Sequence, residues 1–301
     1  MRKGKEIFLA ILLGIILPLL LLYCPKTKNE TAEDDITIAV LMEDGVKNMD
    51  IEEYVLGVLL GELPGDFETE AIKAQAVAAR TFALYRKERQ MVHQDADVCT
   101  QSICCQAYMD PSGYIANGGT ADVVSKMRQC VQATKSEVLF YRGELIDATY
   151  FSSTGGRTED AQAVWGSFVP YLQSVVSGEI ENPQTICFSK KDFCTALGLP
   201  VDEVRVDAPI YTTGGGLENV LINGISFTGT QLRQSLGLRS TQITFTVDKD
   251  SVQITTNGYG HRVGMSQYGA EAMATRGSNY KKILKHYYSG VTIGRYSAVE
   301  N

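Results

Sequence analysis

The sequence predicts an α+β fold, and three observations support this. Residues 242–247 and 251–255 alternate between apolar and polar side chains, a pattern that is typical of strands. Stretches of helical spacing lie around such strands, but without the regular strand–helix alternation of a doubly wound sheet. The length of 301 residues, 44% of them hydrophobic, allows one large or two modest domains. We expect a single catalytic unit over 36–301, with a lobe of its own at 180–256.

The amino-terminal residues predict a membrane anchor. Residues 7–23 carry no charge over seventeen positions, the lower limit for a helix that crosses a bilayer. A cleaved signal peptide is the alternative, but no Ala-x-Ala-like site is found and the apolar run is longer than a usual signal core. Positive charges within residues 1–6 place that end in the cytoplasm. Residues 24–35 are then a polar tether, and the rest of the chain lies outside the membrane.

The overall charge argues against one class of partner. The net charge is −7 and the pI is near 5.1. No basic stripe interleaved with aromatic residues is found in the sequence, so we expect no nucleic-acid partner.

A glutamate near the first predicted helix is the candidate acid. After a strand at 36–42, an Asp-x-x-Glu pattern at Asp50 begins a helix, and Pro64 ends it. Glu62 therefore lies at the helix end with leucines on both sides. Loss of hydration raises the pKa of a carboxyl group, which suits a general acid near neutral pH. A solvated helix-end glutamate is the simpler interpretation, and the local sequence alone favours it.

The next predicted helix carries two candidate substrate-binding cations. It begins at Glu68 or Thr69 and is rich in alanine, which has high helix propensity. Lys73 and Arg80 are seven residues apart and therefore share one face. Two cations near a carboxylate are able to hold an anionic polymer or to tune the acid. A polar helix face that happens to carry two basic residues explains them equally well.

Four potential metal ligands follow within thirteen residues, namely His93, Cys99, Cys104 and Cys105. Their number and type match a closed tetrahedral zinc site. Because the protein fills all four places, we expect a structural zinc and no organic cofactor. The alternatives are free thiols or a disulfide between Cys99 and either Cys104 or Cys105, since a compartment outside the membrane permits disulfides.

A hydroxyl-rich loop is the first candidate for binding uncharged ligand groups. Ser152, Ser153 and Thr154 come directly after a predicted strand and precede two glycines. Their hydroxyl and amide groups suit hydrogen bonds to sugar hydroxyls or an N-acetyl group, although a plain glycine turn is the structural alternative. Trp165, the single tryptophan, is either a sugar-stacking platform or a core residue.

Residues near the carboxyl end are further candidates. His261 lies in a glycine-rich loop where the backbone is able to approach a ligand closely, and it is expected to bond the ligand or assist Glu62, unless it is structural. Gln267 and Tyr268 open the following helix and are expected to face the same cleft.

The other elements follow from local patterns of spacing, capping and turn residues. They are expected as helices at 122–134, 189–197, 230–236, 266–275 and 280–288, two strands within 138–151 and a strand at 291–296.

Three blocks resemble the stage II sporulation protein D family, in the same order along the chain and with a likeness that covers roughly 36–296. The blocks are GELPGDFETEAIKAQAVAARTFAL at 61–84, 151–157 with 164–166 and 169–171, and 258–270. The resemblance implies a peptidoglycan lytic transglycosylase of forespore engulfment in which Glu62 is the catalytic acid. It also implies functional importance for Lys73 and Arg80, and zinc at the cysteine-rich loop, where Cys104 stands in place of a histidine.

The resemblance further implies the substrate, the partners and the location. The substrate is peptidoglycan glycan strands already stripped of peptides, cleaved without water to leave 1,6-anhydro ends. The implied partners are a peptide-removing amidase, stage II sporulation protein P, and the membrane protein M of the same stage. The catalytic unit is expected between the mother-cell and forespore membranes. A muramidase that uses water and a non-catalytic, glycan-binding amidase enhancer are the alternatives.

Overall fold

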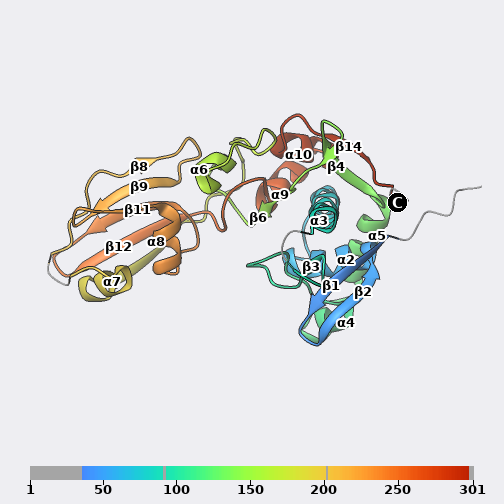
Figure 1. Cartoon of the computed structure of the whole chain (residues 1–301), viewed down its shortest axis with the longest axis horizontal. Coiled ribbons are helices and arrows are strands. Elements are labelled where there is room, and N and C mark those ends of the chain that lie inside the picture. The colour runs from blue at the N-terminus through green and yellow to red at the C-terminus, as the bar shows by residue number, and fades with distance from the viewer. Residues whose placement is uncertain (1–35, 91–92, 201–202, 298–301) are drawn as a thin grey trace, which may run out of the picture. The chain divides into compact units, whose positions relative to one another are not determined.

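The computed structural model describes residues 36–90, 93–200 and 203–297 (Figure 1). Helices and strands are mixed along the chain, so the predicted α+β class is confirmed. The predicted anchor at 7–23 and its flanks, 1–6 and 24–35, lie outside the described residues. Within the described ranges, no helix is both long enough and apolar enough to span a bilayer.

The predicted helices and strands occur close to their expected positions, and several others, among them those at 45–50, 111–116 and 161–165, were not predicted. The helices are α2 (Ile51–Glu62), α3 (Thr69–Arg89), α4 (Pro111–Ala116), α5 (Ala121–Ala133), α6 (Ala161–Trp165), α7 (Lys190–Leu197), α8 (Gly229–Ser235), α9 (Gln267–Thr275) and α10 (Tyr280–Tyr287). The strands are β1 (Thr37–Met42), β2 (Gly45–Asp50), β3 (Val98–Cys99), β4 (Glu137–Tyr141), β5 (Glu144–Leu145), β6 (Tyr150–Phe151), β7 (Gln184–Ser189), β8 (Ile210–Tyr211), β9 (Leu217–Ile222), β10 (Ile225–Phe227), β11 (Gln242–Val247), β12 (Ser251–Asn257), β13 (Met265–Ser266) and β14 (Thr292–Arg295).

The strands form short sheets, and one pairing differs from the sequence prediction. The orders are β2-β1-β3, β10-β9-β8, β11-β12-β7, β13-β6 and β14-β4-β5. β11 and β12, the two strands predicted at 242–247 and 251–255, form an antiparallel hairpin, and β4 and β5 pair around a turn at 142–143. β6 leaves that hairpin and pairs in parallel with β13, so Phe151 lies opposite Ser266. This pairing brings two distant segments of the chain together.

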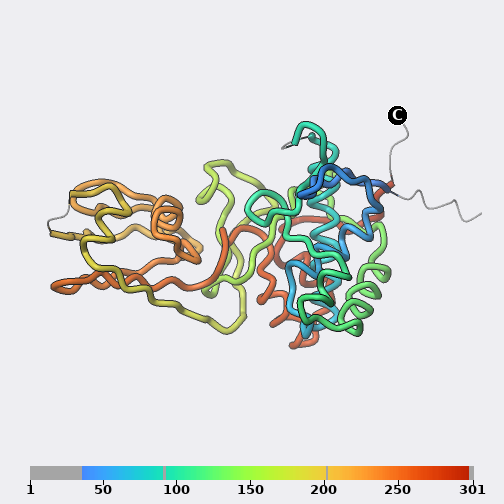
Figure 2. Tube along the Cα trace, turned by 90° about the horizontal axis from the view of Figure 1, so that it is seen from below, coloured from blue at the N-terminus to red at the C-terminus, as the bar shows by residue number. Residues whose placement is uncertain are grey.

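Helix α3 is the centre of the larger core. It packs against α2, α5, α9, α10 and β4. Its alanines are buried and keep the helix thin, so that neighbouring helices approach closely. A second group of buried apolar residues lies among β7 to β12, α7 and α8, including Phe193, Leu232 and Ile254. The backbone of this region is the yellow to orange part of the trace in Figure 2.

A buried ion pair lies beside the second core. Arg262 Nη1 donates to Glu159 Oε1 over 3.2 Å, and both side chains have almost no exposed surface. Thr212 Oγ1 and the Gly216 amide also donate to the Glu159 carboxylate, while Arg262 Nη2 donates to the carbonyl oxygen of Gly214. The pair therefore ties the loop before β9 to the segments on either side of it.

Candidate active site

Glu62 is the last residue of α2 and is half-buried. Asp50 begins the helix by accepting hydrogen bonds from the amides of Glu52 and Glu53, and Leu63, before Pro64, is extended (φ −115°, ψ 143°). Both predicted ends of the helix are confirmed, because N-capping and proline act locally.

Two donors from distant segments hold the Glu62 carboxyl group. The Ala107 amide donates to Oε1 over 2.8 Å, and Gln267 Nε2 donates to Oε2 over 3.1 Å. Burial raises the pKa of Glu62 by more than these two hydrogen bonds lower it. The group is therefore oriented on both oxygens and retains its proton at a higher pH than an exposed glutamate.

Glycines on α2 bring Ala107 to this position. A β-carbon at Gly61 would lie 2.8 Å from the Tyr108 amide nitrogen, and one at Gly57 would lie 2.1 Å from the Tyr108 ring. The Met109 amide also donates to the carbonyl oxygen of Gly57 over 3.0 Å. The segment around Tyr108 thus lies directly against the helix, and any larger side chain at either glycine would displace it.

The start of α9 supplies the second donor. Ser266 caps this helix by accepting from the Gly269 amide, and its hydroxyl donates to Glu179 Oε1 over 2.8 Å. The structure places Gln267 against Glu62, while Tyr268 is 46% exposed and packs edge-to-face on Phe67 at 5.2 Å. An exposed aromatic ring therefore lies next to the residue that contacts the acid.

The hydroxyl-rich loop only partly matches its prediction. Ser152 and Ser153 are half-buried, and the Ser152 carbonyl accepts from the Tyr268 amide over 3.0 Å. Thr154 is buried, and its hydroxyl accepts from the Gly156 amide over 2.9 Å. Thr154 consequently holds the turn, whereas the two serines lie beside the candidate site.

A buried polar layer near Glu62 was not predicted. The Tyr54 hydroxyl donates to Gln106 Oε1 over 3.0 Å, and Gln106 Nε2 donates to the Tyr150 hydroxyl over 2.8 Å. Burial first, and the charge of Glu62 in addition, raises the pKa of both tyrosines. Ala107 acts through its backbone, so its side chain gives no sequence signal. The Gly-x-x-x-Gly spacing at 57 and 61 is the signal that marks this close approach.

Arg80 is not a substrate ligand, which corrects the sequence prediction. Its side chain has no exposed surface, and its Nε donates to Glu52 Oε1 over 3.0 Å while Nη2 bonds the other carboxylate oxygen. Lys73 pairs with Glu70 over 2.8 Å. In the described part of the chain, neither cation is hydrogen-bonded or ion-paired to Glu62. Lys73 and Arg80 share a helix face, but at Arg80 that face packs into the core. The shared face therefore does not bring the two cations to Glu62.

We expect Arg80→Ala to destabilise the fold rather than to remove a substrate contact. Loss of one partner leaves the Glu52 carboxylate buried and unpaired, which costs about 3–5 kcal/mol in the free energy of unfolding. Lys73→Ala on the same helix breaks a partly exposed pair and should cost less than about 1 kcal/mol. Urea denaturation of both variants measures the difference. Wild-type stability with lost substrate binding in Arg80→Ala would contradict this assignment.

His261 is held by the main chain. Its Nδ1 accepts from the Val263 amide over 3.1 Å, and the Tyr150 backbone also bonds the ring. Burial, with a smaller contribution from the charge of Arg233, lowers the pKa of His261 to about 4, so the ring is neutral near pH 7. These contacts indicate that His261 supports the surrounding structure and does not donate a proton to Glu62.

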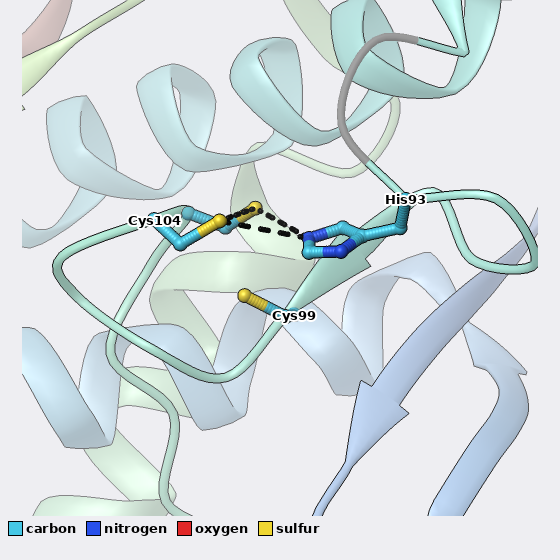
Figure 3. Close-up of side chains that lie close together, drawn as sticks. His93, Cys99 and Cys104 are labelled. Atoms are coloured by element: carbon cyan, nitrogen blue, oxygen red, sulfur yellow. Dashed lines mark hydrogen bonds between the residues drawn. The ribbon is translucent and has the colours of Figure 1, made fainter.

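The four predicted metal ligands come together (Figure 3). All four ligand atoms lie within 4.8 Å of one another. Nε2 of His93 is 3.7 Å from Cys104 Sγ and 3.5 Å from Cys105 Sγ, and the two sulfurs are 3.9 Å apart. Tetrahedral zinc with bonds of about 2.3 Å to sulfur and about 2.0–2.1 Å to nitrogen puts ligand atoms about 3.5–3.8 Å apart. The residues therefore fit one such ion, and the three cysteines of the cluster form no disulfide.

Comparison with known proteins identifies the family. Residues 42–141 match the sequence model of a family described as Stage II sporulation protein. The chain is 36% identical over 270 residues to Stage II sporulation protein D of Bacillus subtilis, covering 85% of this chain and 78% of that protein. The chain belongs to the stage II sporulation protein D family. A second family member, from Bacillus amyloliquefaciens, is 37% identical over 262 residues, which are 82% of this chain and 75% of the relative.

Another relative of this stage II sporulation protein D family member carries a different name. The Amidase enhancer of Bacillus subtilis is 30% identical over 302 residues, covering 80% of this chain but 40% of that protein. The matched family region, 42–141, contains Glu62, Ala107 and the four cluster residues, whereas Gln267 lies outside it. The candidate site thus combines that region with the start of α9.

Proposed function

We propose that this chain is a peptidoglycan lytic transglycosylase that cleaves N-acetylmuramic acid–N-acetylglucosamine bonds of peptide-free glycan strands during forespore engulfment. The observation that best supports this proposal is the state of the Glu62 carboxyl group. Burial raises its pKa, and each of its two oxygens accepts a hydrogen bond. Family membership supports the sporulation setting.

A single carboxyl group suffices for the reaction. Protonated Glu62 gives its proton to the glycosidic oxygen, and the bond between that oxygen and the anomeric carbon breaks. The carboxylate then removes the proton of the C6 hydroxyl group of the muramic sugar, whose oxygen bonds to the anomeric carbon and closes the 1,6-anhydro ring. The proton returns to Glu62, and no water is consumed. Hydrolases of glycosidic bonds ordinarily use two carboxyl groups instead.

Other residues of the site have supporting roles in this proposal. Ala107 and Gln267 fix the orientation of the carboxyl group, which must present its proton to one oxygen and then accept another. Tyr268 offers an exposed ring for a sugar face, and Ser152 and Ser153 offer hydroxyl groups at its side. Lys73 is not one of these supporting residues, and the proposal gives it only a contribution to binding of the glycan strand.

The cysteine-rich loop is proposed as a structural zinc site. His93, Cys99, Cys104 and Cys105 would hold the ion, and the closed ligand set leaves no position for water. Bound zinc would supply a cross-link only. Cys105 is followed directly by Gln106 and Ala107, so this cross-link would fix the segment that donates to Glu62.

The proposal extends to location and partners. Residues 7–23 would anchor the chain in the membrane, with the catalytic unit outside the cytoplasm. Strands without peptides require prior removal of those peptides, so an amidase such as stage II sporulation protein P would act first. The membrane protein M of the same stage is the other proposed partner.

The mass of the products tests the reaction. Peptide-free glycan incubated with purified protein should yield fragments with 1,6-anhydro ends, each lighter by one water than a hydrolysis product. Products at the hydrolytic mass would replace the proposal with a water-using muramidase. Intact glycan would favour a non-catalytic role, as the name of the Amidase enhancer relative suggests.

A further inference from the structure

Trp165 is the single tryptophan of the chain, and 45% of its surface is exposed. It is the last residue of α6, which Gly166 ends in a left-handed conformation (φ 77°). The sequence left open whether this ring is a core residue or a binding platform. Its exposure excludes the core, and exposed apolar groups that gather together commonly mark a binding surface.

A rigid support lies behind the ring. The centre of the His261 ring is 5.4 Å from that of Trp165 and 5.7 Å from that of Phe151. The main-chain contacts of His261 fix its plane, and the imidazole is neutral near pH 7. Trp165 is therefore held in place by an uncharged aromatic neighbour. A rigid aromatic side chain binds a ligand with little loss of conformational entropy.

The supported ring is connected to the candidate active site through β6. Phe151, which packs on His261, precedes Ser152, whose carbonyl accepts from the Tyr268 amide. Gln267, next to Tyr268, contacts Glu62. A continuous set of contacts thus runs from Glu62 to Trp165.

A second exposed ring lies on the same segment. The amide of Tyr259 donates to the Ser153 carbonyl over 2.8 Å, and the Ser153 amide donates back over 3.2 Å. The Tyr259 ring is 49% exposed, and the Arg239 guanidinium lies 5.1 Å from its centre. The backbone of the two serines is therefore hydrogen-bonded to two residues with exposed aromatic rings, Tyr268 and Tyr259.

We infer that Trp165, supported by His261, is a distal sugar-binding platform that stacks on a pyranose ring of the glycan strand away from the bond cleaved at Glu62. The inference rests on the proposed function for the identity of the strand. The C–H face of a pyranose packs on an aromatic ring, while its edge carries hydroxyl and N-acetyl groups that suit Ser152 and Ser153. A strand that reaches both Glu62 and Trp165 binds better than a disaccharide that reaches only one of them.

The fluorescence of Trp165, the single tryptophan, reports directly on ligand binding at this ring. In Glu62→Gln protein, which is expected to hold strands without cleaving them, we expect long peptide-free strands to shift Trp165 emission to shorter wavelength and to reduce its quenching by acrylamide. A disaccharide should do neither. Trp165→Ala should weaken long-strand binding, measured by calorimetry, about tenfold, the order of one aromatic contact. Trp165→Phe should recover part of that loss.

Phe168→Ala is the matched control. Phe168 is 66% exposed, follows Trp165 by three residues and has no ring partner in the described part of the chain. This variant should bind long strands as the parent does. Unchanged Trp165 emission while strands bind, or full binding by Trp165→Ala, would overturn the platform, and the exposed ring would then suit a protein partner instead. Failure of the proposed reaction is distinguishable from failure of the platform. In that case strands would still alter the Trp165 emission, but the unmodified protein would form no anhydro products from them.

Discussion

Glu62→Gln is expected to abolish the formation of 1,6-anhydro products and to leave the binding of glycan strands largely intact. The amide keeps the size of the carboxyl group and much of its hydrogen bonding with Ala107 and Gln267, but it cannot transfer a proton. Since general acid–base catalysis contributes about 10²- to 10⁴-fold, the rate should fall by at least that range. Mass spectrometry of products and calorimetric titration with strands measure the two properties separately.

The control for this variant is Glu68→Gln, which removes the same charge from an exposed position six residues away. It should retain the parental rate. The unmodified protein adds a second check, because the acid must be protonated at the start of the reaction. Activity should therefore persist above the pH at which an exposed glutamate ionises and fall as pH rises through the raised pKa of Glu62. Parental turnover by Glu62→Gln would refute the assignment of the acid.

Removal of zinc is expected to lower both stability and activity. Zinc contributes about 10–16 kcal/mol to the folding of small zinc-dependent peptides. Even about 3 kcal/mol would correspond to a fall in melting temperature of roughly 6–12 °C for a domain of this size. Activity should fall as well, because the released loop carries Ala107, which donates to Glu62. Melting curves with and without a chelator, together with metal analysis of protein purified under reducing conditions, measure these effects.

Two cysteine variants separate the cluster from general thiol effects. Cys105→Ser should bind less than one zinc per chain and melt at a lower temperature. Cys187→Ser removes an exposed cysteine of β7, outside the cluster, and should change neither property. A disulfide in the loop would give the reverse sensitivity, with destabilisation by reductant and none by chelator. Metal-free, chelator-insensitive and fully active protein would end the zinc hypothesis.

Local chemistry made several elements predictable from the sequence. Asp50 and Pro64 set both ends of α2, and Thr228 caps α8 through a reciprocal pair of hydrogen bonds with Gln231. Asp110 followed by Pro111 is an equally local start signal for α4, although this helix was not among those predicted from the sequence. Such signals act within a few residues, so they can be interpreted without knowledge of the fold.

The site itself depends on contacts that a local pattern does not contain. The partner of Arg80 is Glu52, twenty-eight residues away and on another helix, so helical spacing predicted its face but not what that face meets. Thr154 belongs to a hydroxyl-rich loop, yet it is buried, and its amide donates to the Glu179 carboxylate twenty-five residues away. The cluster in the cysteine-rich loop was easier to predict, because its four candidate ligands are close in sequence and come together in space.

The buried pair of Arg262 and Glu159 limits how freely the region from β7 to β12 is able to evolve or to be engineered. Deletion of this region would remove Thr212, Gly214 and Gly216, and the remaining carboxylate and guanidinium would lose most of their neutral partners. A deletion at this point would therefore have to replace both ionic side chains as well. The region from β7 to β12 is therefore not a detachable module, because its loop is bonded to Arg262, which directly follows the residue that supports Trp165.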